Sequence, residues 1–273
     1  MSLTAETQIR FEDGVTYERM MGNWSRRVGE IFLDWLAPSP GLRWVDVGCG
    51  NGAFTELLVG RCSPAEVHGI DPSEEQLAYA RGRPGATTAR FSQGDAMALP
   101  FPGNRFDAAT MTLVIFFVPD PAKGVAELAR VLRPGGTAAA YAWDLFGGGF
   151  PLEPIYIEMR ALGLSPILPP SPEASRIEAM RDLWKAAGFD RVETREIAVQ
   201  RSFADFEEYW TIAATGAPGL SAALAMTAPA DVERIKRGAR TRLTPDISGK
   251  ITCSARVNAV KGRLPPIGPR SVA

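Results

Sequence analysis

One segment sets the expected architecture, Trp44-Val45-Asp46-Val47-Gly48-Cys49-Gly50-Asn51-Gly52-Ala53, in which an apolar strand runs directly into a glycine-rich loop and then a helix. Three glycines in five positions indicate that the backbone approaches a ligand closely at the carboxyl end of this strand. The pattern Gly48-x-Gly50-x-x-Ala53 also satisfies the relaxed dinucleotide fingerprint, and Asp71 follows at the distance of a ribose-binding acid. The loop therefore predicts a nucleotide-type cofactor, with a nicotinamide dinucleotide as one candidate.

Asp46 distinguishes between two kinds of cofactor. It lies two residues before the first glycine, where its carboxylate would repel a pyrophosphate but would suit a ligand that carries an ammonium or sulfonium charge. This favours S-adenosylmethionine over a nicotinamide dinucleotide. The alternative is structural, with the Asp46 carboxylate accepting hydrogen bonds from the N–H groups of the loop.

Short apolar runs alternate with helical segments along the first half of the chain. We expect strands at 43–47, 66–70, 87–92, 105–111 and 136–143. Ser73 with Gln76 forms a capping box, and Asp120 before Pro121 starts a helix that we expect to reach Leu132. Two later strands, at 191–199 and 250–260, would close one edge of the sheet, the last as an antiparallel partner. The pattern predicts an α/β fold with helices on both faces of a mostly parallel sheet.

Two further carboxylates end predicted strands, where ligands of such sheets collect. Because Ser73 already supplies a helix cap, we expect the Asp71 carboxylate to be free for the two ribose hydroxyls. The Asp95 carboxylate could accept from an adenine amino group while the Ala96 N–H reaches a ring nitrogen. The structural alternatives are a turn aspartate before proline for Asp71 and a helix cap for Asp95.

Four motifs occur in order, VDVGCGNG, IDPSEEQLAYAR, GDAMALPFPGNRFDAATM and LARVLRPGGTAAAYAWD. This series resembles that of the class I S-adenosylmethionine-dependent methyltransferases, in particular the broad group similar to ubiquinone/menaquinone-biosynthesis methyltransferases. The resemblance covers about residues 40 to 145 and implies a Rossmann-like sheet of seven strands, the last one antiparallel, with S-adenosylmethionine at its carboxyl edge. It places the cofactor's methionine part at Asp46, Gly48 and Gly50, its ribose at Asp71, and its adenine at Asp95 and Ala96, with Pro72 and Met97 as further cofactor-binding neighbours.

The segment before the first strand predicts an amphipathic helix that resembles the lid helix of many such enzymes. Tyr17, Trp24 and Arg26 could touch the cofactor there, the guanidinium through the methionyl carboxylate. The structural alternatives are core packing for the two aromatic residues and a solvated charge for Arg26.

Candidates for the methyl-acceptor site are mainly aromatic, since such side chains suit a small apolar acceptor. They are Phe116, Trp143, Asp144, Tyr156, Tyr209 and Trp210, with Trp143 and Asp144 directly after the fifth strand as the preferred pair. Each of them could instead belong to the core. No general base is identifiable, because the one histidine, His68, lies near the start of the second strand and away from the carboxyl edge.

Composition limits the partners of the chain. Of 273 residues, 30 are basic and 31 acidic, which gives a formal net charge of −1 without a dense basic block, so a nucleic-acid partner is not expected. Three widely spaced cysteines predict neither a disulfide framework nor a metal site and fit a reducing cytoplasm. The N-terminal segment lacks the features of a signal peptide. The uncharged stretch 209–230 contains glycine and proline, which argue against a membrane span.

We expect one methyltransferase domain over 1–273. It comprises a lid helix in 1–40, a cofactor-binding core in 41–145, acceptor-side insertions at 146–188 and 203–248, and the two closing strands. The competing hypotheses are an NAD(P)-dependent oxidoreductase and a non-catalytic S-adenosylmethionine-binding module. The sequence leaves the acceptor, the methylated atom and the oligomeric state open.

Overall fold

A single seven-stranded sheet forms the centre of the molecule in the computed structural model, which describes residues 18–165 and 167–266. The strand order is β3-β2-β1-β4-β5-β7-β6, and β7 runs antiparallel to both of its neighbours while the first five strands pair in parallel. The expected Rossmann-like fold class is thereby confirmed. The strands are β1 (Arg43–Val47), β2 (Glu66–Asp71), β3 (Arg90–Gln93), β4 (Phe106–Thr112), β5 (Leu132–Trp143), β6 (Asp190–Phe203) and β7 (Ile251–Arg263).

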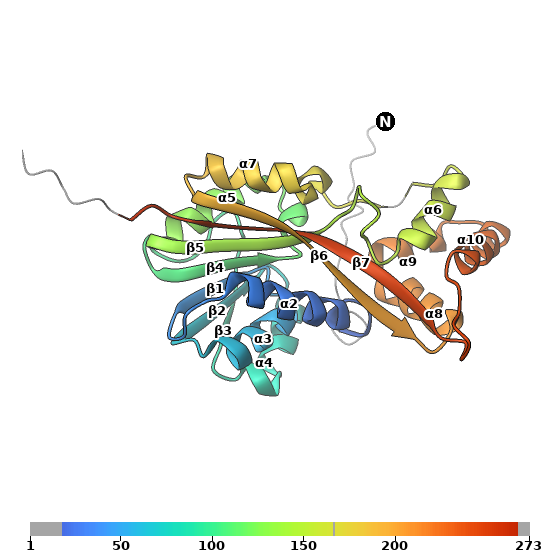
Figure 1. Cartoon of the computed structure of the whole chain (residues 1–273), viewed down its shortest axis with the longest axis horizontal. Helices are drawn as coiled ribbons and strands as arrows, with labels where there is room; N and C mark the ends of the chain where they lie inside the picture. Colours follow the sequence, from blue (N-terminus) through green and yellow to red (C-terminus); the bar gives the residue numbers. More distant parts are fainter. Residues whose placement is uncertain (1–17, 166, 267–273) are drawn as a thin grey trace, which may run out of the picture.

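Helices cover both faces of this sheet (Figure 1). One face carries α2 (Asn23–Leu36), α3 (Ala53–Cys62) and α4 (Glu74–Arg81), and the other carries α5 (Pro121–Val131) and α7 (Ile177–Ala186). Four more helices gather at the far end of the long strands β6 and β7 (Figure 1). We call these four helices the cap: α6 (Glu153–Ala161), α8 (Phe206–Gly216), α9 (Pro218–Ala225) and α10 (Pro229–Thr241).

Local sequence signals set several element boundaries. The Ser73 hydroxyl accepts the Gln76 N–H at 3.3 Å, and the Asp120 carboxylate accepts the Lys123 N–H at 3.1 Å, so both predicted helix starts are confirmed. Helix α5 ends at Val131, one residue earlier than predicted. Strand β5 begins at once with Leu132, which pairs with Phe106 across a register shift.

The predicted strands differ from the observed ones mainly at their ends. The first, 43–47, has the predicted bounds, whereas β3 begins at Arg90 instead of 87, because a short 3₁₀ turn, η2 (Pro84–Ala86), occupies the chain just before it. The closing strands are longer than predicted, since β6 and β7 stay paired from Asp190 opposite Arg263 to Phe203 opposite Ile251. This long antiparallel pair supports the cap.

Aromatic side chains join the helices to the sheet. Phe32 of α2 packs edge-on against Tyr141 of β5 with ring centroids 4.9 Å apart, and Trp184 of α7 donates its indole N–H to the Ala138 carbonyl at 3.1 Å. In the described part of the chain, no helix combines the length and the apolar character needed to cross a membrane. The uncharged stretch 209–230 is divided among α8, α9 and the start of α10.

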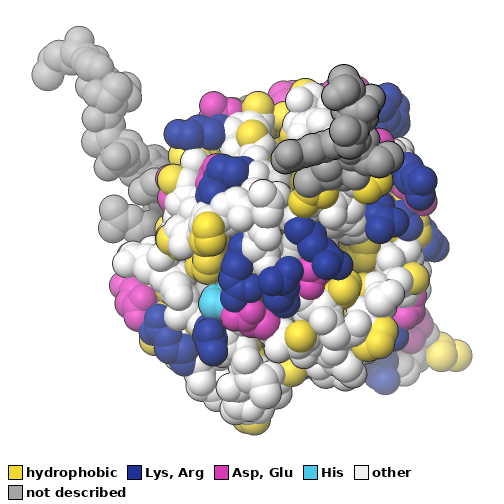
Figure 2. All heavy atoms as spheres, turned by 90° about the vertical axis from the view of Figure 1, so that its left-hand side faces the viewer, with side chains coloured by type: hydrophobic (Ala, Val, Ile, Leu, Met, Phe, Trp, Pro, Cys, Tyr) yellow, Lys and Arg dark blue, Asp and Glu magenta, His cyan; other side chains and the backbone are white. Residues whose placement is uncertain are grey.

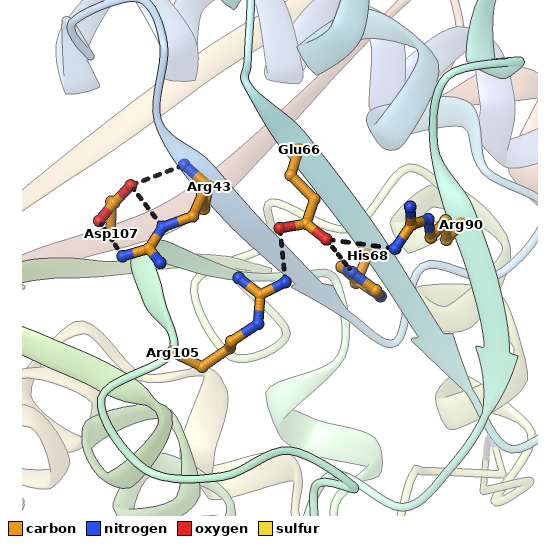
Figure 3. A network of polar contacts seen from close by, with 6 residues as sticks. All are labelled: Arg43, Glu66, His68, Arg90, Arg105 and Asp107. Atoms are coloured by element: carbon orange, nitrogen blue, oxygen red, sulfur yellow. Dashed lines mark hydrogen bonds and ion pairs between the residues drawn. The ribbon is translucent and has the colours of Figure 1, made fainter.

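The amino ends of the parallel strands carry a network of charges at the edge opposite the glycine loop (Figure 3). Arg43 donates to the Asp107 carboxylate through its backbone N–H and its guanidinium. Glu66 accepts from Arg105 at 2.5 Å and contacts His68 Nε2 at 2.8 Å. Figure 2 shows this end of the molecule, where the histidine lies among basic and acidic side chains. These ion pairs join neighbouring strands, so we assign this edge to stability.

The Glu66 carboxylate provides a test of that assignment. The hydrogen bond from Arg105 and that from His68 lower its pKa from 4.5 to about 2. A depressed carboxylate pKa stabilises the fold above the unfolded-state pKa, and this stabilisation is lost as the pH falls from about 4.5 toward 2. We expect Glu66→Gln to lower the free energy of unfolding by about 1–2 kcal/mol at pH 7, and the difference from wild type to shrink below pH 4.5 and to vanish only near pH 2.

Urea denaturation at several pH values would measure this difference. Glu233→Gln is the matched control, because Glu233 is exposed and has no ion pair among the described residues. A Glu66→Gln defect that is independent of pH would contradict the assigned role of the charge.

Candidate functional site

The glycine loop after β1 has a backbone that only glycine adopts without strain. Gly48, Gly50 and Gly52 have φ angles of +70°, +52° and +78°. A Cβ at Gly48 would lie 2.3 Å from a methyl group of Val114, so the loop is tightly packed against the segment that follows β4. A Cβ at Gly50 would meet no atom within 4 Å. The loop therefore offers open space at Gly50, as a backbone that receives a ligand requires.

Asp71, at the end of β2, holds this loop in place. Its Oδ2 accepts the Gly50 N–H and its Oδ1 accepts the Ser73 N–H, both at 2.9 Å. The sequence predicted a carboxylate that is free for a ribose, so the structure corrects that expectation: both oxygens already accept one bond. Each oxygen retains a second lone pair, and burial raises the pKa of Asp71. Asp71 can thus bind ligand hydroxyls while it anchors the loop.

Asp46 lies beneath the loop, with no exposed surface. Its carboxylate accepts from the hydroxyls of Thr55 at 2.6 Å and Thr110 at 3.1 Å. Burial raises the pKa of Asp46 to about 6, although both hydroxyl bonds oppose this rise. In this arrangement, the carboxylate joins β1 to α3 and β4. Its predicted role next to a cationic ligand group would thus act through charge, since both oxygens face threonines.

The segment after β3 forms a turn at the same edge of the sheet. The exposed Asp95 carboxylate accepts the Met97 N–H at 2.8 Å, and Ala96 between them is half-buried. Pro72 is exposed, and its carbonyl accepts from the Gln93 side chain at 2.8 Å. The fold therefore brings the predicted ribose and adenine residues to neighbouring strand ends, next to the glycine loop.

The predicted lid helix contributes less than expected. Tyr17 lies outside the described residues. Trp24 is fully buried and packs edge-on against Trp143 with ring centroids 6.3 Å apart. Arg26 is half-exposed and points to Glu56, with 3.6 Å between the charged atoms. The structure thus places Trp24 in the core, as its structural alternative had it, whereas Arg26 pairs with Glu56, a partner that the sequence did not predict.

An ionic cluster that the sequence did not reveal fastens the start of the lid to the glycine loop. A short π-helix, η1 (Glu18–Gly22), precedes α2, and the Glu18 carboxylate accepts from Asn51 at 2.8 Å and from Arg83. Arg83 also donates to the Asn51 carbonyl at 2.5 Å and to Glu56 at 2.9 Å. These residues are distant in the sequence and belong to no common motif, so no sequence signal links them.

An apolar cavity opens beside the glycine loop, next to the ends of β4 and β5. It holds about 660 Å³ of space free of protein atoms, a volume that includes its opening to solvent. Val114, which packs on Gly48, lies between the wall residues Leu113 and Phe116 in the sequence. The described residues that line the cavity are Met21, Leu113, Phe116, Phe117, Trp143, Leu145, Phe150, Tyr156, Ile167, Leu168, Pro169, Gly216, Ala217 and Gly219.

The cavity includes some of the predicted acceptor residues and omits others. Phe116, Trp143 and Tyr156 lie on its wall. Asp144 does not, because its carboxylate binds the Arg256 guanidinium and the Gly147 N–H. Tyr209 is also absent from the wall and donates its hydroxyl to the Pro151 carbonyl at 3.2 Å, and Trp210 stacks on Phe206. For Asp144 and Tyr209 the structure thus corrects the predicted placement.

Most of the wall was missed from the sequence. Its residues come from the lid, from loops after β4 and β5, from α6, from the proline-rich loop and from the turn between α8 and α9. The one available signal was apolar composition near 165–172 and 209–230, which does not specify an orientation. Across the described residues, no group of three or more His, Cys, Asp or Glu side chains could hold a metal ion. His68 lies at the opposite edge of the sheet, as predicted (Figure 3).

Comparison with known proteins is consistent with this geometry. Residues 45–140 match the methyltransferase domain family. The ubiquinone/menaquinone biosynthesis C-methyltransferase of Cereibacter sphaeroides is 34% identical over 136 residues, which cover 48% of this chain and 54% of that protein. The 2-phytyl-1,4-naphtoquinone methyltransferase of Synechococcus elongatus is 40% identical over 114 residues, covering 39% of this chain and 48% of that protein. The chain thus matches about half the length of these relatives.

Solved structures extend the likeness beyond the matched segment. The YcgJ protein of Bacillus subtilis has a TM-score of 0.58 and 18% identity, and the alignment covers 88% of this chain and 98% of that one. At this identity, the likeness concerns the fold alone. Because the alignment covers 88% of this chain, it extends well beyond residues 45–140.

Gly50 provides a test of the ligand space at the loop. Alanine at Gly50 would lower stability by about 1–2 kcal/mol because of the positive φ, and its methyl group would enter the open space. We expect Gly50→Ala to stay folded and to bind S-adenosylmethionine at least about tenfold more weakly, measured by calorimetry. Gly41→Ala is the matched control, since Gly41 has a φ of +77° and equally open surroundings away from the loop. Equal affinities of the two variants would show that no ligand occupies this space.

Proposed function

We propose that this chain, which carries a class I S-adenosylmethionine-dependent methyltransferase domain, transfers a methyl group from S-adenosylmethionine to a small apolar or aromatic molecule. The observation that carries the proposal is the position of the apolar cavity. Its wall contains Leu113, the residue next to Val114, and Val114 packs on Gly48, so a molecule in the cavity and a cofactor on the loop would be neighbours. The two curated relatives are named as methyltransferases of quinone biosynthesis, which supports the same class of acceptor.

The residues at the carboxyl edge fit such a cofactor. Gly50 leaves open space along the loop backbone, and Asp71 keeps free lone pairs for hydroxyl groups. The turn from Asp95 to Met97 offers backbone and carboxylate groups at the neighbouring strand end. We assign the cofactor's methionine part to the loop at Gly48 and Gly50, its ribose to Asp71 with Pro72, and its adenine to Asp95, Ala96 and Met97.

The chain itself would contribute to the reaction by positioning the acceptor and by excluding water from it. When bound, S-adenosylmethionine supplies an electrophilic methyl group on a sulfonium that leaves as a neutral thioether. The apolar wall holds the acceptor in line with that methyl group and excludes water, which accounts for much of the rate enhancement expected of such a transfer. No Asp, Glu, His, Lys or Arg is among the described wall residues. None of the described wall residues could therefore act as a general base for the acceptor.

The remaining parts of the chain fit this role. We propose that 1–273 acts as one domain, with the cap and the proline-rich loop as acceptor-side insertions, because residues of both line the cavity. We also propose a reducing compartment such as the cytoplasm, supported by the three cysteines, Cys49, Cys62 and Cys253, all of them buried and unpaired. We propose neither a nucleic-acid partner nor a particular oligomeric state.

The binding of S-adenosylmethionine, and its dependence on Asp71, distinguishes this proposal from an NAD(P)-dependent oxidoreductase. We expect wild type to bind S-adenosylmethionine and its demethylated product with a dissociation constant on the order of micromolar. Asp71→Ala should weaken both by at least about tenfold, because it removes a hydroxyl acceptor and releases the Gly50 N–H. Asp120→Ala, which removes a helix cap away from the site, is the matched control for calorimetry. Absence of binding by wild type, or enhanced NADH fluorescence on mixing, would overturn the proposal.

Methyl transfer itself distinguishes an enzyme from a non-catalytic binding module. Wild type, incubated with S-adenosylmethionine labelled in its methyl group and an apolar metabolite extract, should yield a labelled product detectable by mass spectrometry. Trp143→Ala, which opens the cavity wall, should reduce the yield at least about tenfold while cofactor binding persists. Binding of the cofactor with no labelled product in any extract would favour the non-catalytic module.

A further inference from the structure

One hydroxyl group lies on the largely apolar wall of the cavity. Among the described wall residues, Tyr156 is the only one whose side chain carries an ionisable group or an oxygen. It lies on α6 with 8% of its surface exposed, and its ring packs against that of Phe150 with centroids 5.4 Å apart. Its hydroxyl makes no hydrogen bond to any described residue, whereas that of the buried Tyr209 binds the Pro151 carbonyl.

This hydroxyl is not one of the fully buried side-chain atoms that lack a partner among the described residues, so it keeps accessible surface on the wall of the cavity. A ligand oxygen in the cavity could therefore become its partner, and a hydrogen bond of this kind contributes about 0.5–1.5 kcal/mol. Burial and the nearby Glu153 carboxylate raise the pKa of the Tyr156 hydroxyl, so it stays protonated. On this wall, Tyr156 thus offers a hydrogen-bond donor, and the described part of the chain provides no acceptor for it.

We propose that the Tyr156 hydroxyl donates a hydrogen bond to an oxygen atom of the bound acceptor, and that it thereby selects aromatic molecules that carry a carbonyl or phenolic oxygen. The inference rests on the proposed function only in calling the bound molecule a methyl acceptor. The hydrogen bond fixes one end of the acceptor in a wall that otherwise offers dispersion contacts, aromatic faces and, at Trp143, an indole N–H. The orientation of the ring relative to the glycine loop follows from this single bond.

The same wall disfavours two other classes of molecule. A pure hydrocarbon would leave the Tyr156 hydroxyl unpaired in the complex. A cationic amine would enter without a counter-charge, because no carboxylate is among the described wall residues, and desolvation of an unpaired charge is costly. Oxygen-bearing aromatic molecules avoid both costs.

Three probes with one carbon skeleton test this selection. α-Tetralone carries a carbonyl oxygen, tetralin has a methylene in its place, and 2-aminotetralin is an ammonium ion at neutral pH. Titration calorimetry with the intact chain, with S-adenosylhomocysteine present and absent, gives each affinity without any methyl transfer. We expect wild type to bind α-tetralone most tightly and the ammonium compound most weakly.

Tyr156→Phe should weaken α-tetralone binding by roughly 5- to 20-fold and change tetralin binding by less than about twofold. Tyr209→Phe is the matched control, since it removes a buried hydroxyl that does not lie on the wall. Thermal melts of both variants show whether the fold is retained. An unchanged preference for α-tetralone in Tyr156→Phe, tighter binding of the ammonium compound, or no binding of any probe would each overturn the assignment of Tyr156. These results do not depend on catalysis, so they are distinguishable from failure of the methyl-transfer assay.

Discussion

The buried carboxylate of Asp46 is the constraint on which the site depends. It lies at the point where β1, β4 and α3 meet, and the hydroxyls of Thr55 and Thr110 hold it from two of these elements. An unpaired charge at this depth would be expensive, so the two threonines and the carboxylate require one another. Since β1 ends one residue later, at Val47, this contact fixes where the glycine loop begins.

The contacts of the glycine loop with its neighbours depend on where the loop begins. The loop doubles back over β2, where Gly48 and Cys49 both donate to the Ile70 carbonyl and Gly50 donates to Asp71. On its other side, Gly48 packs against Val114, between residues of the apolar cavity. A shift of the loop would therefore disturb Asp71 and the residues beside the cavity wall together. Tight coupling of this kind suits a reaction whose rate depends on alignment.

The sequence predicted the half of the site that local patterns encode. The strand 43–47, the glycine loop and the caps at Ser73 and Asp120 depend on neighbouring residues, and the structure has each where it was expected. The Asp71 carboxylate accepts a hydrogen bond from Gly50, which lies 21 residues earlier in the chain. The periodicity of the sequence does not predict a contact of this kind. The cavity wall combines segments that are distant in the sequence. Its apolar character could therefore be predicted, but the particular residues that form it could not.

The long hairpin of β6 and β7 has a consequence for how such a protein can diversify. The ladder between β5 and β7 ends where Trp143 meets Val257, while β6 and β7 continue as a pair to Phe203 and Ile251. Helices α8 to α10 thus leave and rejoin the sheet through two adjacent, paired residues. A replacement segment of different length could be spliced between these two residues without shifting any strand. Such an exchange would replace the helices that contribute Gly216, Ala217 and Gly219 to the cavity wall, while the glycine loop at the other strand ends stays as it is.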